Sequence, residues 1–199
     1  MSHYYEFDPS LASKPKQVSF EVCGEKLTLT SDIGVFSKNR LDEGTMILLD
    51  TIVPLINEDE FILDLGCGYG AVGMSIASII KSARVLCVDV NPRAVSLAKL
   101  NADTLLLSQR VEARQSDIYE NVDEVFDSIV LNPPIRAGKK VTYRMYLEGI
   151  KHLKTDGSMF IVIRKAQGAL SALEYLESIF SNVKILKKKR GYVVIQAKR

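Results

Sequence analysis

The sequence contains no tryptophan, two histidines and three cysteines. Cys23, Cys67 and Cys87 are scattered and match no metal-binding or redox spacing, so they indicate neither a metal site nor a disulfide framework. His3 and His152 are isolated, and we assign neither a catalytic role. A reducing compartment, the cytoplasm, is therefore expected.

A strong charge of one sign and long apolar runs are also missing. The chain has 26 Lys and Arg against 24 Asp and Glu, and a net charge of +2 argues neither for nor against nucleic acid. No apolar run reaches the roughly 18 residues of a membrane span, and the first residues lack a secretion signal. With 199 residues, 47% of them hydrophobic, we expect one compact cytoplasmic domain without a membrane partner.

Short apolar runs alternate with longer amphipathic runs along most of the chain. Residues 1–17 are polar and predict an N-terminal arm, followed by a single domain over 18–199 with a hairpin at 18–31. The spacing at 44–56 favours a helix that Pro54 shortens. In the core, 58–199, we expect strands at 61–65, 84–88, 111–114, 126–131 and 159–163, helices at 72–80, 92–106, 143–153 and 170–180, and a terminal hairpin from 183–186 and 192–197.

This alternation predicts a doubly wound α/β fold with a mostly parallel sheet and helices on both faces. In such a sheet, ligands bind beyond the carboxyl ends of the strands. The residues at those ends are therefore the candidates for function.

The stretch "LDLGCGYGA", residues 63–71, covers the end of the first of these strands and the turn after it, and contains Asp64, Gly66, Gly68 and Gly70. Glycines allow a tight turn and a close approach of the backbone to a ligand. Asp89 ends the second strand, where a carboxylate can accept the hydroxyl protons of a ribose. The loop alone also fits a dinucleotide-binding dehydrogenase or an ordinary turn, and Asp89 alone could cap the next helix. Together they favour an adenosine site.

Two further strand ends carry polar residues. Asp117 follows the third strand and could accept a hydrogen bond from an adenine amino group, although an isolated loop Asp is more often solvated surface. The fourth strand stops at Asn132-Pro133-Pro134-Ile135, because proline cannot donate to a sheet and makes the preceding residue extended. Asn132 is thereby presented at a carboxyl end.

This turn suits the methylation of a planar amine. The Asn132 side-chain oxygen and the Pro133 carbonyl can accept both N–H groups, which favours a pyramidal nitrogen with its lone pair directed at an electrophile. No strong base is required, because the nitrogen can lose its proton after it gains a methyl group. A rigid turn in which Asn132 bonds its own backbone is the structural alternative.

The order of these motifs resembles the class I S-adenosylmethionine-dependent methyltransferases that act on amino groups. More narrowly, "GVFSKNRLDEGTMILLD", "ILDLGCGYGAVG" and "NPPIRAGKK" look like the small methyltransferase domain (MTS) of ribosomal RNA guanine-N2 methyltransferases. The resemblance covers roughly residue 18 to the end. It implies a Rossmann-like seven-stranded sheet with an antiparallel last strand, S-adenosylmethionine as cofactor, and an exocyclic guanine amine in RNA, ribosomal RNA above all, as substrate.

The resemblance also implies residue roles. The catalytic turn is Asn132, Pro133, Pro134 and Ile135. The glycine loop would approach the methionine part of the cofactor, Asp89 the ribose and Asp117 the adenine. The full set of implied cofactor contacts is Phe36, Asp64, Gly66, Cys67, Gly68, Gly70, Asp89, Val90, Ser116, Asp117 and Asn132.

The sequence departs from the family pattern at Ile135, where many members have an aromatic residue that can stack on a planar base. A glutamine amide or a small-molecule amine therefore stays open as the substrate. An RNA-binding or assembly factor without turnover is the alternative from another class, and the intact Asn-Pro-Pro turn argues against it.

A basic cluster follows the catalytic turn and predicts RNA contacts at Arg136, Lys139, Lys140 and Arg144. The later basic run at 187–190 is equally well explained as solvated surface. Larger relatives carry a second RNA-recognising domain that this sequence leaves no room for. Recognition is therefore expected from this domain's own surface or from a protein partner, a second copy of the chain included.

Overall fold

The computed structural model describes residues 12–37, 39–134 and 138–199. A two-stranded hairpin, β1 (Lys16–Val22) and β2 (Glu25–Ser31), precedes a seven-stranded sheet. The sheet consists of β3 (Phe61–Leu65), β4 (Arg84–Asp89), β5 (Val111–Gln115), β6 (Phe126–Leu131), β7 (Leu153–Arg164), β8 (Asn182–Lys189) and β9 (Tyr192–Lys198). The helices are α1 (Glu43–Ile52), α2 (Ala71–Ile79), α3 (Pro92–Thr104), α4 (Lys139–Gly149) and α5 (Ala169–Ile179).

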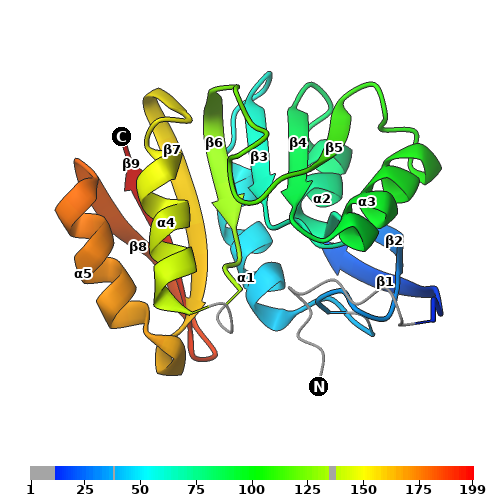
Figure 1. The fold of residues 1–199 in the computed structure, drawn as a ribbon, viewed down its shortest axis with the longest axis horizontal. Helices are drawn as coiled ribbons and strands as arrows, with labels where there is room; N and C mark the ends of the chain where they lie inside the picture. The colour runs from blue at the N-terminus through cyan, green and yellow to red at the C-terminus, as the bar shows by residue number, and fades with distance from the viewer. Residues whose placement is uncertain (1–11, 38, 135–137) are drawn as a thin grey trace.

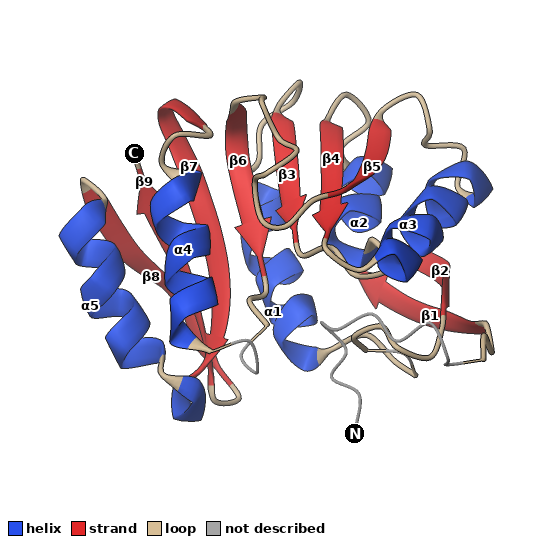
Figure 2. Cartoon of the chain, viewed as in Figure 1, coloured by secondary structure: helices blue, strands red, loops and turns tan. Residues whose placement is uncertain are grey.

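The strand order is β5-β4-β3-β6-β7-β9-β8. The strands from β5 to β7 pair in parallel, and β9 inserts antiparallel between β7 and β8. The arrowheads of β3, β4, β6 and β7 all point to the lower edge of the sheet in Figure 2. Because the chain reverses its direction of winding between β3 and β6, a ligand crevice is expected there. The predicted doubly wound fold with an antiparallel last strand is confirmed.

Both faces of the sheet are buried, which explains why its central strands are nearly continuous apolar runs. On one face, side chains such as Ile62, Val85 and Val130 pack with α1, α2 and α3. On the other, Leu63, Leu86 and neighbouring residues pack with α4 and α5. Figure 1 shows α4 and α5 in front of the sheet, with α1 and α2 behind it. None of the helices in the described ranges has the length and apolarity needed to cross a membrane.

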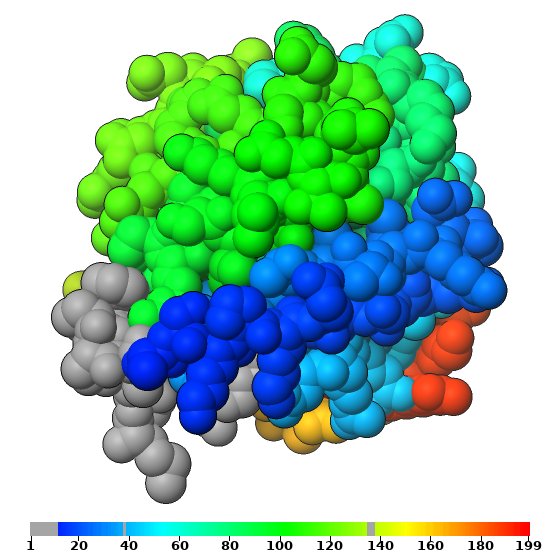
Figure 3. All heavy atoms as spheres, turned by 90° about the vertical axis from the view of Figure 1, so that its right-hand side faces the viewer, coloured from blue at the N-terminus to red at the C-terminus, as the bar shows by residue number. Residues whose placement is uncertain are grey.

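The hairpin lies against the helical layer. Figure 3 shows it, in blue, spread over one side of the molecule next to green residues of the α3 region. Asn101 of α3 ties the two together, because its side chain accepts from the Thr30 N–H at 2.7 Å and donates to the Thr30 carbonyl at 2.9 Å. The same amide donates to the Tyr69 carbonyl at 2.9 Å. The hairpin is thereby connected to the glycine loop.

Several element ends differ from those expected. The strand predicted at 159–163 begins at Leu153, because β6 and β9 supply pairing partners beyond the apolar run. Helix α4 starts at Lys139, one turn before the predicted start, since its first residues are exposed lysines rather than apolar residues. Strand β8 includes Lys187–Lys189, which an exposed edge strand tolerates.

The N-terminal arm was predicted over 1–17, of which residues 1–11 lie outside the described residues. The later part of the arm is attached to the hairpin, and β1 already begins at Lys16. The Asp32 carboxylate accepts hydrogen bonds from the Ser13 hydroxyl at 2.7 Å and from the Lys14 N–H at 2.6 Å. The boundary between arm and hairpin is thus a few residues earlier than expected.

Candidate active site

A pocket of about 670 Å³ opens at the carboxyl ends of β3, β4 and β6. It brings together most of the site residues expected from the sequence. These are Phe36, Asp64, Gly66, Cys67, Gly68, Asp89, Val90, Ser116, Asp117, Asn132, Pro133 and Pro134. Ile135 and Arg136 lie outside the described residues.

The glycine loop turns through backbone conformations that favour glycine, with φ of +73° at Gly66 and +55° at Gly68. The Gly66 N–H donates to the Val88 carbonyl at 2.8 Å, which fixes the loop against the end of β4. A Cβ placed on Gly68 would meet nothing within 4 Å, and one on Gly66 would meet only a methionine methyl at 3.8 Å. The loop therefore leaves open space above its backbone.

Gly70 has a different role from the one expected, because it is absent from the pocket lining. It begins α2 with a φ of +86°, and a Cβ there would come within 3.3 Å of the Ala98 side chain on α3. A side chain at position 70 would separate α2 from α3. Gly70 thus shapes the turn without touching the pocket.

Two acidic side chains lie beneath the loop. Asp64 is 2% exposed and accepts a hydrogen bond from the Gly73 N–H at 2.9 Å. Burial raises the pKa of Asp64 to about 7, and the charge of nearby Asp89 acts in the same direction. Burial also raises the pKa of Asp89. The two carboxyl groups favour a positively charged ligand, whose charge would stabilise their ionised forms.

The Asp89 carboxylate accepts from the Gly68 N–H and from the Asn91 N–H, both at 2.9 Å. It therefore joins the glycine loop to the turn after β4. The cap of α3 is Asn91, whose side chain accepts from the Arg93 N–H at 3.0 Å. The alternative in which Asp89 caps that helix is wrong, since the capping position belongs to Asn91.

The segment that carries Phe36 is held over the pocket by α3. Asn91 donates from Nδ2 to the Gly34 carbonyl at 3.0 Å, and Arg93 donates from Nη1 to the Ile33 carbonyl at 2.9 Å. Phe36 is 38% exposed within the lining. Sequence reasoning missed these two contacts of Asn91 and Arg93. The available signal was an Asn directly before a Pro at a helix start, which indicates a helix cap and not a contact with a distant segment.

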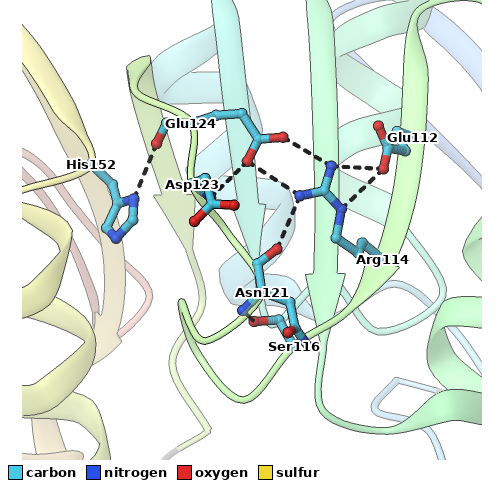
Figure 4. A network of polar contacts seen from close by, with 7 residues as sticks. All are labelled: Glu112, Arg114, Ser116, Asn121, Asp123, Glu124 and His152. Carbon is cyan, nitrogen blue, oxygen red and sulfur yellow. Dashed lines mark hydrogen bonds and ion pairs between the residues drawn. The ribbon is translucent and has the colours of Figure 1, made fainter.

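The loop between β5 and β6 is held by the polar network in Figure 4. Arg114 forms ion pairs with Glu112 at 2.8 Å and with Glu124 at 2.9 Å, and donates to the Asn121 carbonyl at 2.9 Å. The Asn121 N–H in turn donates to the Ser116 hydroxyl at 3.0 Å. Ser116 and the neighbouring Asp117 are thereby kept at the pocket.

Asn132 is bonded to α1. Its Nδ2 donates to Asp42 Oδ2 at 3.1 Å and to Thr45 Oγ1 at 3.0 Å. Asp42 is also the N-cap of α1 and accepts from the Thr45 N–H at 3.1 Å. The alternative in which Asn132 bonds its own backbone is not observed within the described residues. Sequence reasoning missed Asp42 and Thr45, since a residue pattern reveals a cap and not its long-range partner.

The predicted basic cluster is divided by the structure. Lys139 and Lys140 are exposed at the start of α4. Arg144 instead faces three carboxylates, with Glu148 at 2.8 Å and Asp117 and Glu120 at 3.7 and 3.6 Å. Because these acidic partners compensate its charge, Arg144 braces the β5–β6 loop and is a poor candidate for phosphate binding.

The profile of the methyltransferase small domain family matches residues 26–196. The chain belongs to this family. The methyltransferase is 45% identical to the "uncharacterized protein YbxB" of Bacillus subtilis, over 99% of this chain and 98% of that protein. It is 35% identical to "ribosomal RNA small subunit methyltransferase C" of Actinobacillus succinogenes, over 85% of this chain and 50% of the relative.

Among solved structures, the methyltransferase resembles the T. thermophilus 16S rRNA N2 G1207 methyltransferase, whose structure is a complex with AdoMet and guanosine. The two are 26% identical with a TM-score of 0.85, over 96% of this chain and 52% of the other. The chain spans about half the length of these ribosomal RNA methyltransferases. The predicted enzyme class and its cofactor, S-adenosylmethionine, are confirmed, and the dehydrogenase alternative falls away.

Proposed function

We propose that this methyltransferase transfers a methyl group to the exocyclic amine of a guanine in small-subunit ribosomal RNA. The observation that carries the proposal is the shared pocket, in which Asn132 and Pro133 lie with the glycine loop, Asp89 and Asp117. The names of the relatives and of the T. thermophilus enzyme support the choice of RNA.

The residues of the pocket fit S-adenosylmethionine. The open space above Gly66 and Gly68 would admit the methionine part, and the buried carboxyl of Asp64 suits its positive charge. Asp89 accepts from the backbone of Gly68, Val90 and Asn91 and keeps acceptor capacity for a ribose hydroxyl group. Asp117 is exposed in the pocket lining and would accept a hydrogen bond from the adenine amino group. When bound, the cofactor supplies an electrophilic methyl group on a sulfonium.

The Asn-Pro-Pro turn would prepare the amine. Asn132 Oδ1 and the Pro133 carbonyl accept its two N–H groups and direct the lone pair at the methyl carbon. An amine nitrogen held in this way would take the methyl group that the cofactor supplies. The methylated nitrogen then loses a proton to water, so the chain needs no strong base.

Tyr192 brings an aromatic ring into the pocket lining, with the Arg164 guanidinium 5.3 Å from the ring centroid. Such a ring could pack against a guanine base and would take over the stacking that the departure at Ile135 removes. This favours a flipped base over a small aliphatic amine.

Exposed cations lie at the same edge of the sheet. Arg164 pairs with Tyr192 across β7 and β9, and Lys189 pairs with Tyr192 across β8 and β9. The basic run of β8 therefore ends close to the pocket. We define the basic rim as Lys139, Lys140, Arg164, Lys165, Lys187, Lys188 and Lys189. It would hold phosphates while the base enters the pocket.

The test is methylation of small-subunit ribosomal RNA from cells that lack the protein, offered both free and in assembled subunits. Radiolabelled S-adenosylmethionine is supplied, and the RNA is digested to nucleosides. We expect label in N2-methylguanosine with the wild type and little with Asn132→Ala. Label only in protein would move the assignment to a glutamine amide, and no label in RNA or protein would overturn the proposal.

A further inference from the structure

The side-chain amide of Asn132 has a defined orientation. A carboxylate can only accept hydrogen bonds, so the amide nitrogen must face Asp42, and the oxygen must point the other way. The second N–H of the same nitrogen is taken by Thr45 Oγ1 at 3.0 Å. Within the described residues no donor reaches the Asn132 oxygen, which belongs to a residue of the pocket lining.

We propose that Asp42 and Thr45 are positioning residues that hold Asn132 Oδ1 toward the incoming amine. The inference rests on the proposed function, because it assigns the oxygen to an N–H donor of the substrate. Both residues line the same pocket, and this role requires contact with Asn132 and not with the amine. They act through Asn132 by keeping its side-chain amide from turning over. The turned amide would present its N–H groups to the N–H groups of the amine, and two donors cannot form a hydrogen bond.

The helix gives this arrangement its rigidity. Thr45 is 5% exposed, and its backbone N–H is bonded to the same Asp42 oxygen that accepts from Asn132. Next to it, Gly44 is so close to Tyr192 that a Cβ on the glycine would lie 2.7 Å from the ring. The first turn of α1 therefore has little freedom to move away from the turn that carries Asn132.

The charge of Asp42 adds a second effect. Hydrogen bonds from an amide nitrogen to a carboxylate are stronger than neutral ones, and they polarise the amide toward its oxygen. Asn132 Oδ1 thereby becomes a better acceptor for the amine N–H. Asp42→Asn keeps a good helix cap and removes this charge, so it tests polarisation with the fold intact.

The kinetic test compares three variants in which a threonine of α1 is replaced. Thr45→Val removes the acceptor with nearly the same shape, and we expect kcat for RNA methylation to fall about three- to tenfold. Thr45→Ser restores the acceptor and should stay close to the wild type. Thr51→Val is the matched control, because within the described part of the chain the Thr51 hydroxyl bonds only the Ile47 carbonyl of its own helix, at 2.6 Å. The KM for S-adenosylmethionine should not change in any of them.

A second measurement needs no turnover and so separates this inference from the proposed function. The Asn132 side-chain NH₂ signals are assigned by their loss in Asn132→Asp, and their hydrogen exchange is measured by NMR. We expect slow exchange in the wild type and in Thr51→Val, and faster exchange in Thr45→Val and Asp42→Asn. If the Asn132 amide of the wild type exchanges as fast as the exposed Asn182 amide, the inference is overturned. An unchanged kcat in Thr45→Val would also overturn it. Slow exchange in an enzyme that leaves RNA unmethylated would instead refute the proposed substrate alone.

Discussion

At the scale of single residues, we expect Asn132 to act in methyl transfer and to contribute little to cofactor binding. Its side chain bonds the start of α1 and lines the pocket, whereas the glycine loop and Asp89, the proposed cofactor contacts, line another part of that pocket. We expect Asn132→Ala to reduce kcat about tenfold or more while the Kd for S-adenosylmethionine stays nearly constant. Isothermal titration and the labelled-RNA assay measure the two quantities. Loss of cofactor binding, or unfolding of the variant, would contradict this division of roles.

The buried carboxyl group of Asp64 should give the free energy of unfolding an unusual dependence on pH. Burial raises its pKa in the folded protein from 3.8 to about 7, so between these pH values the folded state holds a proton that the unfolded state has lost. The stabilisation is complete below pH 4 and disappears as pH rises through 7. The free energy of unfolding of the cofactor-free protein should therefore fall over this range.

Asp64→Asn should reduce this slope, because asparagine has no proton to lose and can still accept from the Gly73 N–H. Part of the slope should remain, since burial shifts the pKa of Asp89 in the same direction. Urea unfolding at a series of pH values provides the measurement. An identical slope in the variant and the wild type would refute the assignment.

At the scale of elements, the sequence predicts the bounds of a helix or strand correctly where burial alone determines them. Strands β3 and β6 have the predicted ends, because each begins and ends with apolar residues and is bounded by turn residues. The start of β7 depends on its neighbours, and the start of α4 lies in exposed lysines, so neither follows from apolar spacing. Most pocket residues could be predicted from the sequence, because parallel strands bring their carboxyl ends together. Asp42, Thr45 and Asn101 were missed, since their roles arise from contacts between distant segments.

Asn101 links three elements, and its removal should destabilise all of them together. The side chain is 1% exposed and bonds both backbone groups of Thr30 as well as the Tyr69 carbonyl. Asn101→Ala takes a partner from two partly buried groups of Thr30 and from the buried Tyr69 carbonyl, and we expect a loss of about 3 kcal/mol in the free energy of unfolding. Exposed Asn182→Ala is the control and should change it by less than about 0.5 kcal/mol. Urea denaturation measures the free energy of unfolding of both variants. If Asn101→Ala lost no more than Asn182→Ala, the contacts of Asn101 would contribute nothing to stability.

At the scale of the whole molecule, the glycine loop, the Asn-Pro-Pro turn and the basic rim lie at one edge of the sheet. The proposed RNA contacts lie on the surface at this edge, in a chain that spans about half the length of the ribosomal RNA methyltransferases it resembles. The antiparallel β9 contributes to that surface by bringing β8, and with it Lys187–Lys189, to the same edge as the end of β7. The terminal hairpin thus extends the site as well as the sheet.

This arrangement predicts that RNA affinity depends on charges at one edge only. Lys139→Glu combined with Lys140→Glu should weaken binding and reduce the slope of log K against log salt by about one unit for each phosphate that is no longer bound. Lys81→Glu combined with Lys151→Glu changes the net charge equally, but at turns that lead into the amino ends of β4 and β7. Filter binding of ribosomal RNA at several salt concentrations compares the pairs. If both pairs weaken binding equally, attraction comes from net charge; if only the rim pair lowers the slope, phosphates are held beside the pocket, where the base must enter.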